Sequence, residues 1–582
     1  RSTDAGQAGH LETHASQLAE EHAVSPRPQM KVPLIDRLAD LDRLLADAYA
    51  YFSQISEVQG APSRAAEWLL DNYHLVRQAI QQIGEDMPEG YYRRLPKLTT
   101  AAMAGLPRIY ALACELIQHD NGRLDLDRVT RFVRTYQQIT PLTMGELWAL
   151  PTMLRLSLLE LLAWAVVRAT EMDKDVSQTL FEEVTPSGEL SSDVAVANTI
   201  TGLRFMATQD WETFFETVSR VEETLSTDPA GIYADMDFET RDRYRKVVED
   251  LAWVTGRDEE DVARAAIALA RAAVDLARAH FAPEIAEMDL YDIPRVAHVG
   301  FYLVDEGREQ LETHIKYTPA WHVRVRRWLL DRAVFVYLGG IDLLTLVVMA
   351  SLIGYAYTAG GTALQLVAVA LLTLIPASAI AVNAINWIVT HTVPSRMLPK
   401  MDFRQGIPAG CRTMVVIPAL LSNENEVESL LRQVELHFIG NTDPHLAFAL
   451  LTDFVDAPQE HMDQDDALLD QAQAGIKALN RKYGNDAARP FYLFHRRRLW
   501  NPGEEQWMGW ERKRGKLNEF NRFLRGDDAT SFIATQGNLD VLPAIRYVIT
   551  LDADTTLPRE SARRLVATLA HPLNRAQFDP DS

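Results

Sequence analysis

Two carboxylates at the end of an apolar run are the residues with the clearest chemical potential in this chain. Residues 547–558 read YVITLDADTTLP, and the apolar or β-branched residues 548–551 predict a buried strand. Asp552 and Asp554 follow, and residues two apart on a strand point to the same side. We therefore expect both carboxylates to meet one divalent cation, Mg²⁺ or Mn²⁺, at the C-terminal edge of a sheet, where open α/β sheets bind ligands. Such a cation would neutralise a departing diphosphate, as nucleotide-sugar transfer requires.

The acidic pair alone leaves two alternatives open. Most D-x-D pairs are solvated turn residues. An apolar strand followed by D-x-D-x-T-L is also the nucleophile motif of haloacid-dehalogenase-type phosphatases, in which the first Asp attacks phosphorus. The rest of the chain has to decide between them.

A basic segment precedes the acidic pair. Residues 510–518 read WERKRGKLN, with cations at Arg512, Lys513, Arg514 and Lys516. Four cations and a glycine just ahead of a helix would suit a diphosphate, although a solvated basic face is equally compatible. A second basic run, residues 496–498 beside Trp500 and Trp507, would line a channel for a sugar chain or be a loop anchored by tryptophans.

Alternating strands and helices are expected around these motifs. Apolar runs predict strands at 413–418, 446–451, 490–494 and 547–551, and amphipathic patterns predict helices at 427–436, 463–483 and 516–524. This alternation predicts a parallel, doubly wound sheet. Right-handed crossovers then put Asp453 and the Asp552/Asp554 pair along one edge.

The N-terminal half is expected to be all-α. Residues 1–30 are polar and are predicted to form a tail, and residues 31–320 a helical cytoplasmic domain. Residues 147–167 are Leu-rich but carry Pro151, Arg155 and Glu160, so we expect a buried core helix rather than a membrane span. No chemistry can be named in this region, which suggests a scaffold or regulatory role.

A membrane hairpin is expected within residues 321–400. Residues 333–357, with Asp342 as their only charge, and residues 362–388, with none, are each long enough to cross a bilayer of about 30 Å. Arginines and a lysine flank the pair, at 324, 326, 327, 332, 396, 400 and 404, and the short connecting loop has neither. The positive-inside rule therefore makes both flanking regions cytoplasmic. The alternative is a buried hairpin in a soluble protein.

Composition excludes some classes of partner. The chain has 582 residues and a net charge of -22, which argues against binding nucleic acid. Cys114 and Cys411 lie far apart and form no metal-ligand spacing or disulfide framework, as in a reducing compartment. The chain begins at Arg1 and ends soon after the acidic pair, so we expect part of a longer protein.

Several motifs in this order resemble a known family. VVIP (415–418), LLTD (450–453), KRGKLN (513–518) and VITLDAD (548–554) resemble a processive GT-A glycosyltransferase. The longer stretches WMGWERKRGKLNEFN (507–521) and YVITLDADTTLPR (547–559) resemble the cyclic β-1,2-glucan synthases of bacterial envelopes. The resemblance implies a mixed fold: an all-α N-terminal region, a transmembrane helical hairpin, and a GT-A-like α/β domain over 401–582 that is incomplete at its C-terminus.

The resemblance also implies an activity. It is that of a multi-pass enzyme of the bacterial inner membrane that moves glucose from UDP-glucose onto a growing β-1,2-glucan. Transfer would be inverting and metal-dependent, would start on a tyrosine of the enzyme and would end in cyclisation, with further transmembrane and phosphorylase-like parts elsewhere in a longer chain. The β-1,2 linkage rests on the resemblance alone.

The resemblance implies roles for single residues as well. Asp552 and Asp554 would hold the metal and the UDP diphosphate, and Asp453 would contact the uridine end. The side chains that would lie near the donor phosphates are Lys513, Arg514, Lys516 and, more weakly, Asn518.

Two parts of the family's machinery have no match in the sequence. The general base is expected beyond the chain end, so the fragment alone should bind UDP with a metal and turn over little UDP-glucose. Tyr483 and Tyr492 are candidate priming residues, although a core tyrosine explains both equally well. A membrane scaffold with a degenerate transferase domain is the non-enzymatic alternative.

Overall fold

The computed structural model describes residues 2–25, 34, 36–59, 63–99, 103–170, 190–281, 294–393, 395–484, 489–527 and 529–577. The chain forms two compact units. The first comprises Arg1–Thr227 with Arg245–Ile267, and the second Asp228–Tyr244 with Ala268–Ser582.

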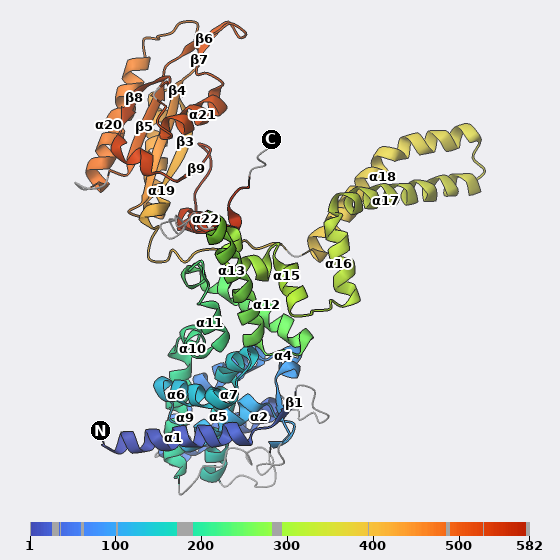
Figure 1. Ribbon diagram of the computed structural model, residues 1–582, viewed down its shortest axis with the longest axis vertical. Helices are drawn as coiled ribbons and strands as arrows, with labels where there is room; N and C mark the ends of the chain where they lie inside the picture. The colour runs from blue at the N-terminus through green and yellow to red at the C-terminus, as the bar shows by residue number, and fades with distance from the viewer. Residues whose placement is uncertain are drawn as a thin grey trace. The chain divides into compact units, whose positions relative to one another are not determined.

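The first unit is built from helices (Figure 1). Its helices are α1 (Ser2–Glu21), α2 (Asp36–Gln59), α3 (Arg64–Asp86), α4 (Glu89–Arg94), α5 (Arg108–His119), α6 (Leu126–Ile139), α7 (Met144–Thr170), α9 (Ser192–Thr208), α10 (Trp211–Val218) and α11 (Arg220–Leu225), with parts of α12 (Phe238–Thr255) and α13 (Glu259–Phe281). A short antiparallel pair, β1 (Val24–Ser25) and β2 (Lys97–Leu98), completes it.

Helix α7 is the core of this unit. It is long and apolar enough to cross a membrane, but 94% of its most apolar window is buried by its neighbours. Two of its charged residues have polar partners: Tyr110 donates a buried hydrogen bond of 2.8 Å to Glu160, and Arg155 lies 3.4 Å from the partly exposed Asp86. The prediction of a buried core helix is confirmed.

The predicted polar tail is wrong for residues 2–25. Residues 2–21 form α1, which packs against α6. Leu11, Ala15 and Leu18 are buried, and their i, i+4, i+7 spacing gives the helix an apolar stripe that the polar composition concealed.

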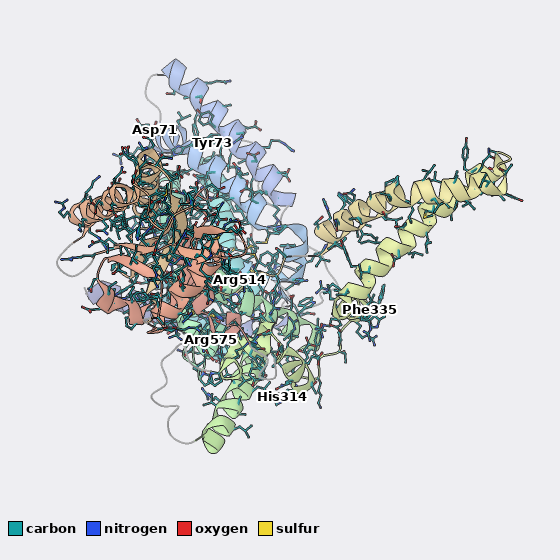
Figure 2. The ribbon with its side chains drawn as sticks, turned by 90° about the horizontal axis from the view of Figure 1, so that it is seen from above. Asp71, Tyr73, His314, Phe335, Arg514 and Arg575 are labelled. Atoms are coloured by element: carbon teal, nitrogen blue, oxygen red, sulfur yellow. The ribbon has the colours of Figure 1, made fainter. Side chains whose placement is uncertain are left out.

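Two long apolar helices in the second unit lie side by side in Figure 1: α17 (Ala333–Thr358) and α18 (Ala363–Thr392). Only 6% and 11% of their most apolar windows are buried, and Phe335, labelled in Figure 2, is 81% exposed. Apolar helices of this length and exposure indicate membrane association, and they lie where the sequence predicts them. The hydroxyl of Tyr337 donates to Asn386 across the pair, at 2.8 Å.

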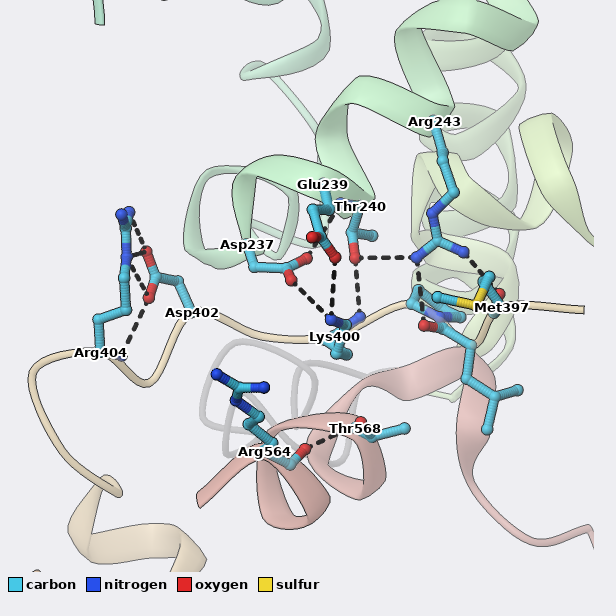
Figure 3. Close-up of polar contacts among 12 residues, drawn as sticks. Asp237, Glu239, Thr240, Arg243, Met397, Lys400, Asp402, Arg404, Arg564 and Thr568 are labelled. Carbon is cyan, nitrogen blue, oxygen red and sulfur yellow. Dashed lines mark hydrogen bonds and ion pairs between the residues drawn. The ribbon is translucent and has the colours of Figure 1, made fainter. Parts of the chain in front are cut away.

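The segment after α18 is fixed by polar contacts, which Figure 3 shows. Lys400 lies 3.2 Å from Asp237, and Arg243 donates to the carbonyl of Met397 at 2.6 Å. On its other side, the amide of Met401 donates to the carbonyl of Ala567 in α22 (Ser561–Ala570), at 3.0 Å. The connection from the apolar helices to the sheet is therefore held on both sides.

The sheet lies in the C-terminal part of the second unit. Its strands are β3 (Thr413–Leu421), β4 (Leu446–Phe454), β5 (Phe491–Arg496), β8 (Phe532–Gln536) and β9 (Tyr547–Thr550), in the order β8-β5-β4-β3-β9. Four run parallel, where the sequence predicts them, and β8 pairs antiparallel with β5. The sheet is therefore mixed rather than all-parallel. Short β8 lies at an edge and has little apolar periodicity, so the sequence did not reveal it.

Helices α19 (Glu424–Gly440), α20 (Asp465–Tyr483) and α21 (Arg512–Leu524) cover the sheet. Strand residues alternate between its two faces. Val416, Leu451 and Phe494 form one core cluster with Phe520 of α21. Their neighbours in the strands face the other side, where Phe448 packs against Phe438 of α19, with ring centroids 6.0 Å apart. Helices on both faces make this a doubly wound α/β arrangement.

Candidate functional site

The carboxyl ends of β4, β3 and β9 meet at one edge of the sheet. Leu420 of β3 is in register with Asp453, and Val416 with Thr550 of β9, so Asp453 and Asp552 both lie at this edge. The chain leaves β3 for β4 on one side and returns to β9 on the other side of β3. Open α/β sheets bind ligands at such a reversal of strand order.

The acidic pair lies on an exposed turn rather than on the strand. β9 ends at Thr550, the amide of Leu551 donates to Val416 at 3.0 Å, and the carbonyl of Asp552 accepts from the amide of Thr555 at 2.9 Å. Strand alternation therefore does not place the two carboxylates, because the strand ends two residues before Asp552, and a cation shared by Asp552 and Asp554 stays a prediction. Asp552 and Asp554 are both exposed and accessible to a soluble ligand.

Helix α21 begins at Arg512, four residues before the predicted start at Lys516. Glu511 and Arg512 both have left-handed backbones, with φ of 44° and 48°, which costs about 1–2 kcal/mol per residue. Strain of this kind gathers at functional sites. The bend places Lys513 in the first helical turn, where its ammonium group contacts the carboxylate of Asp552.

The first turn of α21 carries cations and no acidic residue. Helix N-termini favour negative charge, and Lys513 and Arg514 add positive charge there, which Asp552 and Glu511 offset in part. Arg514 projects into solvent, 87% exposed, and pairs only weakly with Glu511 at 3.3 Å (Figure 2 labels Arg514). This end of the helix is suited to phosphate oxygens.

A buried ion pair lies beneath this edge. Alternation along β4 and β5 puts Asp453 and Arg496 on the α21 face, and the guanidinium group donates to both carboxylate oxygens, at 2.8 and 2.9 Å. Arg496 is fully buried, and Asp453 is 2% exposed. Arg496 also donates to the carboxylate of Glu519 at 3.1 Å. Burial alone would lower the pKa of Arg496, but Asp453 and Glu519 outweigh it and raise that pKa.

Lys516 completes this network. Its ammonium group lies 3.1 Å from Asp453 and donates to the carbonyl of Ala419 in β3 at 2.6 Å. Burial lowers the pKa of Lys516, and Asp453 opposes that shift in part. The lysine therefore ties α21 to β3 and β4.

The predicted donor-binding residues fall into two groups. Lys513 and Asp552 are in contact in the exposed group, which also contains Arg514, Asn518 and Asp554. Asp453 and Lys516 form the buried group. Both oxygens of Asp453 are already bonded to cations, so its contact with a nucleotide stays a prediction.

Two glycines allow this packing. A Cβ atom on Gly509 would lie 2.6 Å from Cγ of Asp453, and one on Gly515 would collide with the carbonyl oxygen of Trp510. The W-x-G-W-x-x-x-x-G pattern of residues 507–515 therefore has a steric basis.

Sequence reasoning missed Glu519 and His495. His495 is fully buried, its Nδ1 lies 2.9 Å from the hydroxyl of Thr452, and its ring packs edge-on against Phe454. Burial lowers the pKa of His495 to about 4, so the ring is neutral near pH 7. Its place at the end of a predicted strand, directly before Arg496, was the only available signal.

A hairpin beside α21 carries the exposed tryptophans. β6 (Leu499–Asn501) pairs with β7 (Gln506–Met508). A cavity of about 490 Å³ lies on it, lined by Leu499, Trp500, Asn501, Pro502, Glu504, Met508, Trp510, Glu511 and Arg512. Trp500 is 49% exposed and Trp510 41%. Arg496 and Arg498 do not line the predicted channel, because they are buried in ion pairs with Asp453 and Asp465. Arg497, between them, is exposed.

The two candidate priming tyrosines are engaged in the fold. Tyr492 is 2% exposed and belongs to the core of the sheet. The hydroxyl of Tyr483 donates to Glu435 at 2.7 Å. The alternative of a core tyrosine holds for Tyr492.

Comparison with known proteins relates the chain to one curated protein. The chain is 32% identical over 590 residues to the cyclic β-(1,2)-glucan synthase NdvB of Rhizobium meliloti strain 1021, an alignment that covers 89% of this chain. The chain spans about a fifth, 20%, of the length of that relative. No family model matches the chain.

Proposed function

We propose that this chain carries the donor-binding part of a membrane glycosyltransferase that moves glucose from UDP-glucose onto a growing β-1,2-glucan. The observation that carries the proposal is the contact of Lys513 with Asp552 at the carboxyl edge of the parallel strands. The relationship to a cyclic glucan synthase and the exposed apolar helices α17 and α18 support it.

Asp552 and Asp554 are the residues that would hold the metal. Carboxylate oxygens are the ligands that Mg²⁺ and Mn²⁺ prefer. Within the described ranges no group of three or more His, Cys, Asp or Glu residues could hold an ion. Two protein carboxylates would therefore share the metal with donor phosphate oxygens and water, as Mg²⁺ sites commonly do. When bound, the metal supplies positive charge to the departing UDP.

Lys513 and Arg514 would bind the donor diphosphate from the start of α21. Without a bound donor, Lys513 neutralises Asp552. When the donor binds, the ammonium group would turn to its phosphates. Its position depends on α21, which Lys516 and the Arg496–Asp453 pair fix against the sheet. We infer that Asp453 and Lys516 position the donor site from beneath it.

The cavity on the β6–β7 hairpin is the place we propose for the growing glucan. Its 490 Å³ falls in the range of small-molecule sites, about 300–1,000 Å³. Indole rings such as those of Trp500 and Trp510 offer flat apolar faces to sugar rings, and Asn501 and Glu504 offer hydrogen bonds to hydroxyl groups. Arg512 links this cavity to α21, because it lines the cavity and begins the helix.

Calorimetry with UDP tests the donor site. We expect residues 1–582 in detergent to bind UDP in the presence of Mn²⁺, and Asp554→Ala to remove that binding. Manganese-independent UDP affinity, or none at all, would contradict the proposal.

Two further assays test the reaction class. Membranes that contain the longer protein should convert labelled UDP-glucose into protein-bound and soluble glucan, and Asp554→Ala should abolish both. Hydrolysis of p-nitrophenyl phosphate that is lost in Asp552→Asn would support the phosphatase alternative instead.

A further inference from the structure

Helix α16 (Trp321–Asp331) is an eleven-residue helix in which no residue is buried. It reads WHVRVRRWLLD and ends two residues before Ala333, the first residue of α17 (Figure 1). Helices of this length seldom persist in water without packing. A surface outside the described chain is therefore expected to cover part of α16.

The exposed side of α16 is apolar. Trp321, Val325, Trp328 and Leu329 follow i, i+4, i+7, i+8 spacing and share one face. They are 72%, 47%, 53% and 39% exposed. A helix that packs on a soluble core turns such a stripe inward, but this stripe faces away from the protein.

The opposite side of α16 contacts the protein through charge. Arg327 binds both oxygens of Glu312 in α15 (Arg308–His314), at 2.7 Å each. Glu312 also accepts from Arg308 at 2.9 Å, and these partners lower the pKa of Glu312 against its burial. This pair fixes the rotation of α16, with the apolar stripe turned outward.

Arginines border the stripe on both sides. Arg324 lies about 40° around the helix from Trp328, and Arg326 about 60° from Leu329 on the other side, at about 100° per residue. Both are exposed. The guanidinium group of Arg332 lies 5.1 Å from the ring of Trp328. Three arginines, Arg324, Arg326 and Arg332, therefore border the stripe, and Asp331 is the one acid in α16.

We propose that α16 lies in the surface of the bilayer that α17 crosses, with its tryptophans at the headgroup level and Arg324, Arg326 and Arg332 bound to the phosphates of anionic phospholipids. The bilayer is the surface that covers the apolar stripe, because only one residue, Arg332, separates α16 from a 26-residue apolar helix. A basic amphipathic helix with tryptophans beside a membrane span is typical of interfacial anchors.

This contact does not depend on glucan synthesis. It gives the chain a second attachment to the membrane beside α17 and α18. The Arg327–Glu312 pair connects this attachment to α15. The lipid composition of the bilayer would therefore influence how α15 is held near the membrane surface.

A fluorescent label at position 325 tests the proposal in the full chain. Val325→Cys carries a nitrobenzoxadiazole group in protein reconstituted into vesicles, since both native cysteines are buried. With 30% phosphatidylglycerol we expect a blue-shifted emission that doxyl-labelled lipids quench and iodide does not. The matched control is Leu436→Cys, at a residue of α19 that is 68% exposed, where iodide should quench and doxyl lipids should not.

Charge variants test the lipid headgroups separately. Arg324→Gln with Arg326→Gln should raise the phosphatidylglycerol fraction needed for half-maximal quenching roughly threefold or more, and lysine at both positions should restore it. Resistance to alkaline extraction checks that α17 and α18 are still inserted. Absence of doxyl quenching at 325, or quenching that neither anionic lipid nor the variants change, would overturn the proposal. Protection from iodide without doxyl quenching would assign the stripe to a protein partner instead.

Discussion

Arg496 of β5 binds Asp453 of β4 through two hydrogen bonds of 2.8 and 2.9 Å, with both side chains buried. Bidentate pairs of this kind are strong and directional. Lys516 and Glu519, both in α21, extend the pair on either side. The network therefore determines where α21, and with it Lys513, lies at the sheet edge.

Asp453→Asn should destabilise the sheet-containing part of the second unit. The substitution leaves Arg496 and Lys516 buried without their full counter-charge, and losing one partner of a buried pair costs about 3–5 kcal/mol. We expect the lower end of this range, because the amide still accepts a hydrogen bond. Urea unfolding followed by tryptophan fluorescence measures it.

Asp527→Asn is the matched control for Asp453→Asn, since Asp527 pairs with Arg522 at an exposed site and its removal should change stability little. If Asp453→Asn unfolds like the wild type but no longer binds UDP, then the nucleotide, and not the network, is the main partner of Asp453.

Asp552→Asn and Asp554→Asn should weaken UDP binding and leave stability nearly unchanged. Both residues are exposed on a turn, so the free energy of unfolding should change by less than about 0.5 kcal/mol. The manganese-dependent affinity for UDP should fall at least about tenfold, or 1.4 kcal/mol, in each variant. Asp540→Asn, at an exposed acid elsewhere in this part, is the control for the loss of one negative charge. Unchanged affinity in both variants would remove the metal site from the proposal.

Lys513→Ala should weaken UDP binding more than uridine binding, because we propose that the ammonium group binds the phosphates, which uridine lacks. We expect about a tenfold loss for UDP at low salt and a smaller loss at 0.5 M salt, since exposed charges are screened. Arg525→Ala, at the other end of α21, is the matched control. Equal losses for UDP and uridine would mean that Lys513 acts through the fold of the helix.

The parallel strands could be predicted because each is a short apolar run and amphipathic helices alternate with these runs. Their common edge followed from the handedness of crossovers. The end of β9 could not be predicted, because Leu551 continues the apolar run although the chain leaves the sheet after Thr550. The strand therefore ends one residue earlier than predicted, and Asp552 and Asp554 lie on a turn that does not continue its alternation.

The buried network was beyond sequence reasoning. A run of three arginines is typical of a solvated surface, yet Arg496 is buried because β5 extends two residues past the predicted end and carries it onto the α21 face. The start of α21 was also missed, because a left-handed backbone at non-glycine residues such as Glu511 and Arg512 is uncommon and is not a sequence signal for the start of a helix. Exposed residues such as Lys513 and Asp552 were easier to identify, because their chemistry shows in their type and spacing.

Trp500→Ala and Trp510→Ala should weaken binding of a linear β-1,2-glucan oligosaccharide. Loss of one indole face costs about 0.5–1.5 kcal/mol, so we expect a threefold to tenfold lower affinity in calorimetry. UDP affinity should remain unchanged, which separates this cavity from the donor site. Trp253→Ala, at a tryptophan of α12 that is 45% exposed, is the matched control. If that control loses as much affinity, the oligosaccharide binds nonspecifically to exposed indoles.

His495 should make stability depend on pH. Burial lowers the pKa of His495 to about 4, whereas an unfolded histidine has a pKa of about 6.5. Between these values the unfolded chain binds a proton that the folded chain excludes, so stability falls as the pH falls through this window. Between pH 7.0 and 5.5 the loss from this residue should be about 1 kcal/mol.

His495→Gln isolates this contribution from those of other buried histidines. Burial also lowers the pKa of His22, His437 and His571 and raises that of Glu259 to about 8, so the wild-type chain alone gives only the sum of all these contributions. Glutamine keeps a hydrogen bond to Thr452 within reach but does not titrate. Unfolding free energies from urea titrations at pH 7.0 and 5.5 should therefore fall by about 1 kcal/mol less in the variant than in the wild type. Equal losses in the two proteins would show that His495 takes up its proton in the folded state as readily as in the unfolded chain, and that the ring is not held neutral by the sheet.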